Sequence, residues 1–165
     1  GMAAIYGTIE HLRADPRSQL FEGGSAAEFT KTLQKNDLGI TGGHQSGILI
    51  PKSNIELLNF LPRLDNGVKN PDAWIECLDE DDVSWKLRYI HYNNKFHDEG
   101  GTRDEYRITH IMPFLRKMGA MTGDIFHIKR DSFVGPYIIS IEEKEKAEPV
   151  GGVIKVKLSG WNKVC

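Results

Sequence analysis

The sequence contains little cysteine, little net charge and no long apolar run, and each shortage excludes a class of protein. Its two cysteines, Cys77 and Cys165, are too few for the disulfide framework of a small secreted domain. A net charge of −2 argues against a strongly basic, non-specific polyanion binder. No apolar stretch approaches membrane-spanning length, and no segment near the start has the pattern of a signal peptide. We therefore expect a cytoplasmic protein with reduced thiols.

The chain is long enough to bury one hydrophobic core. Of its 165 residues, 39% are hydrophobic and 27% are charged, which is ordinary for a globular domain. Residues 3–14 favour a short helix, which Asp15 and Pro16 would end. We therefore predict an N-terminal helix or arm over residues 1–25 and a single domain over residues 26–165.

Most of this domain has the period-2 alternation of β-strands. The strongest case is "DVSWKLRYIHY" at residues 82–92, where Val83, Trp85, Leu87 and Tyr89 share one face. Further predicted strands are "AEFTKTLQ" at residues 27–34, "GILI" at 47–50, "DIFHIKR" at 124–130, "PYIISIE" at 136–142 and "VIKVKL" at 153–158.

Two short helices are expected between these strands. Ser53 and Glu56 have the spacing of a capping box. An apolar stripe follows at Ile55, Leu58 and Leu61. The segment "HIMPFLRKMG" predicts the second helix, which ends near Gly119. Many short strands with two or three short helices predict a mainly β fold, a barrel or a sandwich, rather than alternating β–α units.

The glycine-rich stretch "KNDLGITGGHQSGILIPK", residues 35–52, is the first candidate site. A phosphate-binding loop needs a strand before it, a helix after it and a Gly-Lys-Ser/Thr ending. Here the glycines lead into a strand and that ending is absent, and a dinucleotide-binding fold fails for the same reason. Taken alone, the glycines indicate a tight turn with positive φ angles.

A metal centre and a nuclease centre are the next candidates. None of the six histidines is paired at i, i+4 or lies near a cysteine with zinc spacing, so we expect no metal and no cofactor. Many nucleases carry Pro-Asp followed by Glu-x-Lys, whose carboxylates hold a metal ion. Asp72 and the run at residues 142–144 have this pattern. A complete small magnesium-dependent nuclease therefore stays open as an alternative.

The stretch "HYNNKFHDEGGTRDEYRIT", residues 91–109, is rich in side chains that read base edges. Arginine and lysine pair with guanine, asparagine with adenine, and glutamate with the cytosine amino group. Glu105 lies between Arg103 and Arg107. A carboxylate beside DNA is costly unless it accepts a specific donor or orients an arginine. The alternative is a charged hairpin whose surface ion pairs contribute little.

These two stretches together resemble the N-terminal effector domain of EcoRII-type restriction endonucleases. The run "NDLGITGGHQSGILIP" is similar to that family's Asn-Asp-x-Gly-x-Thr-Gly-Gly-His-Gln-x-Gly-x-x-Ile-Pro stretch. The run "YNNKFHDEGGTRDEYRIT" is similar to its Tyr-Asn-x-Arg…Thr-Arg-x-Glu-x-Arg-Ile-Thr stretch. In addition, "MTGDIFHIKRD" resembles the Gly-Asp-x-aromatic strand of the plant B-three domain.

The resemblance implies a DNA-binding pseudobarrel of about seven short strands with two or three short helices. In that family two arms enter the major groove of duplex DNA from either side, and the EcoRII effector domain binds the sequence CCWGG. By similarity the N-terminal arm covers residues 31–45 and the C-terminal arm covers residues 94–107. The implied partner is double-stranded DNA, with a nuclease domain either linked or separate and no membrane. A β-barrel interaction domain without DNA binding is the remaining alternative.

The resemblance also implies which residues contact DNA, and none of them is catalytic. Those assigned to phosphates are Lys31, Lys35 and Lys52. Those assigned to base edges or to the geometry of the N-terminal arm are Asn36, Asp37 and His44. Those assigned to base reading in the C-terminal arm are Lys95, Arg103, Glu105 and Arg107, with Tyr92 and Tyr106 at the DNA backbone. Thr41, Gln45 and Asn94 complete the set.

Overall fold

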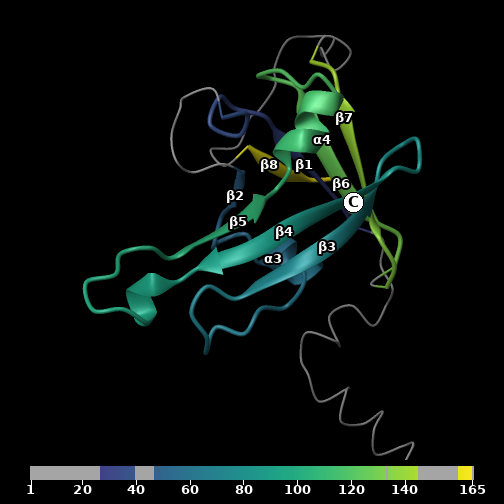
Figure 1. Ribbon diagram of the computed structural model, residues 1–165. Coiled ribbons are helices and arrows are strands. Elements are labelled where there is room, and N and C mark those ends of the chain that lie inside the picture. The colour runs from purple at the N-terminus through teal and green to yellow at the C-terminus, as the bar shows by residue number, and fades with distance from the viewer. Residues whose placement is uncertain (1–26, 40–46, 133, 145–159, 165) are drawn as a thin grey trace, which may run out of the picture.

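The computed structural model describes residues 27–39, 47–132, 134–144 and 160–164 (Figure 1). Its strands are β1 (Ala27–Thr32), β2 (Ile48–Ile50), β3 (Asp72–Leu78), β4 (Ser84–Tyr92), β5 (Glu105–Thr109), β6 (Ile125–Arg130), β7 (Tyr137–Glu142) and β8 (Trp161–Lys163). Its helices are α3 (Ile55–Phe60), α4 (Met112–Lys117) and the 3-10 turn η1 (Asn94–Phe96). Within these residues no helix is long and apolar enough to cross a membrane.

All eight strands belong to one curled sheet, in the order β2-β5-β4-β3-β7-β6-β1-β8. Among the described residues, only the pairing of β3 with β7 is parallel, and it is limited to Cys77 opposite Tyr137 and Leu78 opposite Ile138. The two outermost strands are bridged, because the indole Nε1 of Trp161 in β8 donates to the carbonyl oxygen of Leu49 in β2 at 3.0 Å. The sheet therefore curls until its ends meet, which confirms the predicted mainly β pseudobarrel.

The core fills the inside of this curl with large side chains. Phe126 contacts both Phe114 of α4 and Trp161 of β8, with ring centroids 6.3 Å and 6.4 Å apart. All three side chains are 0–1% exposed. On the other side of the core, the hydroxyl of Tyr137 donates to the carbonyl oxygen of Phe60 at 2.8 Å and so fixes the end of α3 to β7. Helices α3 and α4 thus both pack their buried side chains into the one core that the sheet encloses.

Most predicted elements are present with shifted ends. The predicted strands at residues 82–92, 124–130 and 136–142 are β4, β6 and β7. Helix α4 ends before Gly119, whose φ of +63° is the left-handed conformation of a helix C-terminus. Strands β3 and β8 were not predicted. The strand expected at residues 153–158 and the helix expected at residues 3–14 lie outside the described residues.

Helix α3 differs from its prediction in cap and in buried face. Its cap is Asn54 rather than Ser53, because the amide of Leu57 donates to Asn54 Oδ1 at 3.1 Å. The helix face toward the sheet carries Leu57, Phe60 and Leu61, spaced i, i+3, i+4. Ile55, predicted to be part of the apolar stripe, is 60% exposed. The predicted stripe was therefore right for Leu61, which is buried, and for Leu58, which packs against the core, and wrong for Ile55.

Candidate nucleic-acid interface

The C-terminal arm is the connection between β4 and β5. Tyr92 pairs with Glu105 at the end of the antiparallel ladder, and residues 93–104 with η1 form the connection beyond it. Figure 1 shows this connection reaching out from the sheet at one end of β4, far from the turn that joins β3 to β4 at the other end. The arm is therefore a continuation of the two strands.

Glu105 holds two arginines at the base of this arm. Both Nε and Nη2 of Arg103 donate to Glu105 Oε1, at 3.0 Å and 2.7 Å. Nε of Arg107 lies 3.3 Å from the other oxygen, Oε2. These residues alternate along an extended segment, so their side chains share one face. One carboxylate thus positions two guanidinium groups.

The cluster is half-buried and carries more positive than negative charge. The side chains of Arg103, Glu105 and Arg107 are 34%, 22% and 10% exposed. Burial raises the pKa of Glu105, but the hydrogen bond from Arg103 and the charges of Arg107 and Arg103 outweigh it, so the pKa lies below its ordinary value. Glu105 is therefore ionised at neutral pH and stays paired.

Tyr92 and Asn94 hold Arg103 from two more sides. The guanidinium carbon of Arg103 lies 3.8 Å from the centre of the Tyr92 ring, a cation–π contact. The backbone amide of Arg103 donates to Asn94 Oδ1 at 2.7 Å. Gly101 packs so closely on Asn94 that any side chain at residue 101 would collide with the backbone carbonyl oxygen of Asn94. Lys95, next to Asn94, is exposed. Arg103 is consequently fixed in direction before any ligand arrives.

Tyr106 faces the other way from its neighbours in β5. Its ring stacks on His91 with centroids 4.0 Å apart and an interplanar angle of 9°. Tyr89 stacks beyond it at 5.9 Å. This placement, in a row of rings on the inner side of β4 and β5, does not support the DNA-backbone contact assigned to Tyr106.

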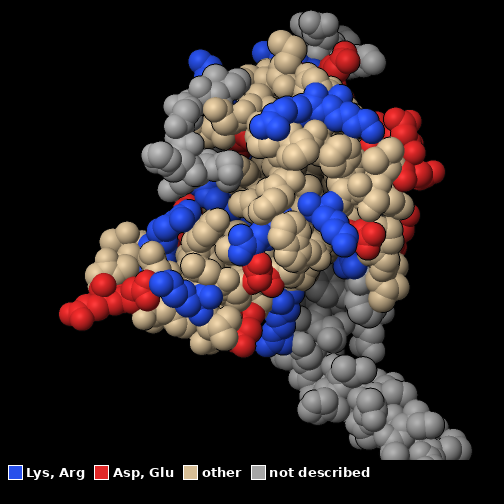
Figure 2. Space-filling view, in the orientation of Figure 1, with Lys and Arg blue, Asp and Glu red and all other residues tan. Residues whose placement is uncertain are grey.

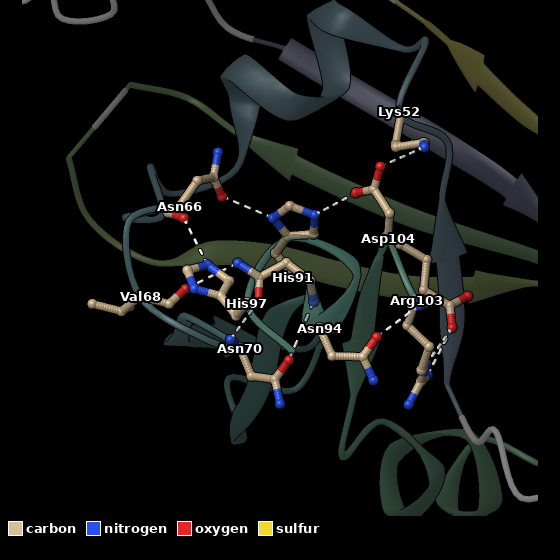
Figure 3. A network of polar contacts seen from close by, with 11 residues as sticks. Lys52, Asn66, Val68, Asn70, His91, Asn94, His97, Arg103 and Asp104 are labelled. Carbon is tan, nitrogen blue, oxygen red and sulfur yellow. Dashed lines mark hydrogen bonds and ion pairs between the residues drawn. The ribbon is translucent and has the colours of Figure 1, made fainter. Parts of the chain in front are cut away.

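His91 connects the base of the C-terminal arm to two other segments (Figure 3). Its Nε2 lies 2.8 Å from Asp104 Oδ1, and its Nδ1 lies 2.8 Å from Asn66 Oδ1. The second oxygen of Asp104 accepts a hydrogen bond from Lys52 Nζ at 2.8 Å. The pKa of Asp104 is lowered by the hydrogen bond from Lys52 and then by that from His91. One carboxylate therefore joins β4, the arm and the segment after β2.

A second contact ties the start of the arm to the loop before β3. Asn93 and Asn70 bond reciprocally, amide to side-chain oxygen, at 2.7 Å and 3.2 Å. Nδ2 of Asn93 also donates to the carbonyl oxygen of Val68 at 2.9 Å. Further along, Lys69 pairs with Asp98 at 2.6 Å. The arm is braced along its length by residues 66–70.

The described part of the N-terminal arm contains a buried ion pair. Lys31 Nζ donates to Asp37 Oδ2 at 2.9 Å, and the two side chains are 5% and 7% exposed. Asp37 Oδ2 also accepts the backbone amide of Gln34 at 2.8 Å. This geometry does not support the phosphate contact assigned to Lys31. It fits the arm-geometry role assigned to Asp37.

The remaining residues assigned to this arm fall into two groups. Lys35 and Asn36 are exposed on the turn that follows β1. Thr41, His44 and Gln45 lie outside the described residues.

Acidic side chains gather at two places away from the arginines. Figure 2 shows acidic side chains at the tip of the arm, where Asp98 and Glu99 are exposed. A second acidic group lies at the β3–β4 turn, on residues 80–82. Basic side chains are spread over the face between these two places (Figure 2). The local charge of this face therefore differs from the net charge of the chain.

The geometry argues against the nuclease alternative. Asp72 precedes Cys77 by five residues and Glu142 follows Tyr137 by five, while Cys77 and Tyr137 are opposite each other in the parallel pairing. At about 3.3 Å per residue the two carboxylates lie roughly 30 Å apart. Within the described ranges no group of three or more His, Cys, Asp and Glu side chains could hold a metal ion. Asp72 and Glu142 cannot share one.

Sequence reasoning did not assign His91, Asp104, Asn66 or Asn93 to this site. A signal for His91 was present, because it continues the predicted inner face of β4 two residues after Tyr89. A histidine on an inner face needs hydrogen-bond partners. Its partners, however, come from residues 25 positions before it and 13 positions after it, which no local pattern reveals.

Known proteins match the part of the chain that contains both arms. Residues 23–116, more than half of the chain, match the family described as "Restriction endonuclease EcoRII, N-terminal". The Type II restriction enzyme EcoRII from Escherichia coli is 36% identical over 102 residues, which cover 57% of this chain and 24% of that enzyme. The chain thus spans about a quarter of that relative's length.

A solved structure resembles the fold. The Arabidopsis FUS3–DNA complex superposes with a TM-score of 0.51 and 21% sequence identity, covering 69% of this chain and 94% of that one. Its similarity extends the shared pseudobarrel beyond the segment that the sequence comparison matched. On the match over residues 23–116, the chain belongs to the family of EcoRII N-terminal domains.

Proposed function

We propose that this chain binds double-stranded DNA in a sequence-specific manner and is the target-recognition module of a restriction endonuclease. The observation that carries the proposal is the cluster in which Glu105 holds Arg103 and Arg107 at the base of a projecting arm. The proposal is supported by the similarity to a type II restriction enzyme and by the shared fold with a protein solved as a DNA complex.

The chemistry of this cluster suits the major groove. An arginine fork donates two hydrogen bonds to the O6 and N7 of guanine, and a glutamate accepts from the amino group of cytosine. Arg103 and Arg107 would supply the forks, while Glu105 both orients them and offers an acceptor. Since the pairings and the Tyr92 stack exist in the free protein, little side-chain entropy is lost on binding.

Exposed lysines would supply the affinity that does not depend on sequence. Lys35 and Lys95 on the two arms and Lys52 after β2 are exposed and would contact phosphates, releasing counterions. We keep Asn36, Thr41, His44 and Gln45 as contacts of the N-terminal arm on the sequence resemblance alone. Lys31 and Asp37 would act by shaping that arm, and Asn94 by holding Arg103.

Catalysis would belong to a further domain, linked to this one or separate. We also propose a cytoplasmic location, where DNA is accessible and thiols stay reduced. Cys77 suits it, being free and buried, and burial raises its pKa to about 12, so the thiol is unreactive at neutral pH.

A fluorescence-anisotropy titration tests the proposal directly. Two labelled duplexes of equal composition, one containing CCWGG and one shuffled, are titrated with the protein at two salt concentrations and without divalent metal. We expect affinity for both to fall as salt rises, with tighter binding to one sequence. If CCWGG is not preferred, selection from random DNA identifies the target. Failure to bind any duplex at low salt would refute the proposal.

A further inference from the structure

We propose that Asp104 and His91 are positioning residues that set the sequence preference of the C-terminal arm without contacting DNA. This inference rests on the proposed function and concerns the same interface. Asp104 stands between Arg103 and Glu105 in the sequence, but its side chain points to the opposite side, toward His91. Its anchor therefore fixes the backbone from which both DNA-facing side chains extend.

The anchor is strong because each oxygen of Asp104 has its own cation or ring donor. Oδ2 accepts from Lys52 and Oδ1 accepts from His91, both at 2.8 Å. Since the carboxylate is ionised, it can only accept, so Nε2 of His91 must carry the proton in this bond. The side chains of Asp104 and His91 are 16% and 6% exposed, so water competes little for the bond between them. Lys52 is 55% exposed, and its bond to Asp104 is open to solvent.

His91 is itself held on three sides. Its side chain is 6% exposed, its ring stacks on Tyr106, and its Nδ1 lies 2.8 Å from the side-chain amide of Asn66. Figure 3 shows His91 between Asn66 and Asp104, with Lys52 on the far side of Asp104. A ring with this many contacts has one orientation. The ring therefore fixes Asp104, and with it this part of the arm, relative to strand β4.

Lys52 gives the anchor a second consequence. Lys52 lies just after β2, so the Lys52–Asp104 bridge joins the C-terminal arm to the segment that follows this edge strand. Asp104 is thus held to β4 and to the segment after β2 at once. Displacing it should change how the C-terminal arm fits the groove, and base recognition depends on such fit more than phosphate contact does.

The change in DNA affinity on removing the Asp104 carboxylate distinguishes a positioning role from simple repulsion of phosphates. A carboxylate near DNA that only repels phosphates would, when removed, tighten binding to every duplex alike. A positioning carboxylate would, when removed, lower the ratio between preferred and shuffled duplexes. Glu99 offers a matched control, because it is an exposed acid on the same arm outside this network.

The experiment measures both duplexes with five proteins: wild type, Asp104→Ala, His91→Phe, the double variant that combines these two changes, and Glu99→Ala. The preferred duplex is CCWGG or the sequence that wild type selects from random DNA. We expect Asp104→Ala to reduce the preference about 10-fold or more, with affinity for the shuffled duplex unchanged or tighter. His91→Phe keeps the ring stack on Tyr106 and should reduce the preference similarly. The double variant should lose little more, since both changes break one anchor. Glu99→Ala should leave the preference intact.

The outcomes are distinguishable. An Asp104→Ala protein that behaves like Glu99→Ala overturns the positioning role and leaves the proposed function standing. A wild-type protein that shows no preference among duplexes overturns both. Thermal unfolding of each variant, together with its retained affinity for the shuffled duplex, identifies a variant that has failed to fold. In that case Asp104→Asn, which keeps an acceptor for His91 but releases Lys52, decides the question by the same ratio.

Discussion

The two arms each contain a carboxylate held by cations, but the two are held in opposite ways. In the N-terminal arm, Asp37 and Lys31 neutralise each other one to one, and both are almost fully buried. In the C-terminal arm, Glu105 is shared by Arg103 and Arg107, and the group remains partly exposed. The first pair has no charge left to offer a ligand. The second has one positive charge in excess, and Arg103 is 34% exposed.

The difference teaches that a basic residue in an arm is not by itself a DNA contact. Lys31 and Arg103 both occur in stretches that resemble a DNA-binding family, yet burial assigns one to structure and exposure leaves the other for recognition. The following four predictions separate these roles, from the largest expected effect to the smallest.

Breaking the buried pair should cost the most stability. Asp37→Ala would leave the ammonium group of Lys31 buried and unpaired, which we expect to lower the free energy of unfolding by about 3–5 kcal/mol. Replacing both residues by apolar ones, as in Lys31→Met with Asp37→Leu, should restore most of this loss. Urea denaturation measures both. Asp98→Ala, which removes the exposed pair with Lys69, is the control and should cost under about 1 kcal/mol.

Removing the shared carboxylate should act on recognition instead. Glu105→Ala removes the carboxylate that orients both arginines and also removes an acceptor, so we expect the preference between target and shuffled duplexes to fall by about 1–3 kcal/mol. Stability should change little. Anisotropy titration with both duplexes measures the ratio, with Glu99→Ala as the variant of equal charge change. An unaltered ratio would mean that this cluster does not read bases.

Neutralising an exposed lysine should weaken all duplexes alike. Lys35→Ala removes a phosphate contact, so the slope of log affinity against log salt should fall by about 0.9. The affinity ratio between duplexes should not change. The same titrations over a salt series test this. A change in the ratio with no change in slope would place Lys35 at a base edge.

Protonation of Glu105 in acid should break its pairing with Arg103 and Arg107, with a small effect on stability. The pKa of Glu105 is lower in the folded protein than its ordinary value, so its pairing stabilises the fold above that ordinary value and is lost as pH falls through the folded pKa. Wild type should exceed Glu105→Gln by a few tenths to about 1 kcal/mol near neutral pH, and the difference should vanish in acid. Urea denaturation across pH follows it. A difference that grows in acid has the wrong sign for this pairing.

Much of this architecture was predictable where one face of a strand is buried. The alternation in β4 was clear because Leu87 and Tyr89 point inward while Ser84 and Lys86 point outward. Strand β3 escaped prediction because an exposed tryptophan, Trp74, precedes its inner residues Ile75 and Cys77, and acidic residues lie between and around them. Strand β8 is only three residues long, too short for any period to be visible.

In the candidate site, the sequence predicted which side chains share a face, but it did not predict the partners that these side chains contact. Arg103, Glu105 and Arg107 alternate, so their shared face followed from spacing alone. Lys31 alternates with Phe29 and Leu33, both buried, and this pattern already pointed to an inner lysine. What no pattern could supply was its partner. Pairings such as Asp104 with Lys52, 52 positions apart, depend on the folded topology.

The bond that joins Trp161 to Leu49 also orders events in time. Its partners are 112 positions apart, and such distant contacts form late because the entropy of closing a long loop must be met first. Strands β3, β4 and β5 pair with sequence neighbours and can assemble earlier, with the C-terminal arm between them. The chain has three tryptophans, at positions 74, 85 and 161, and Trp161 is 1% exposed, so in a background with both Trp74→Phe and Trp85→Phe we expect the fluorescence of Trp161 to report a slow final phase of refolding. The C-terminal arm would then form before the Trp161–Leu49 contact closes the barrel.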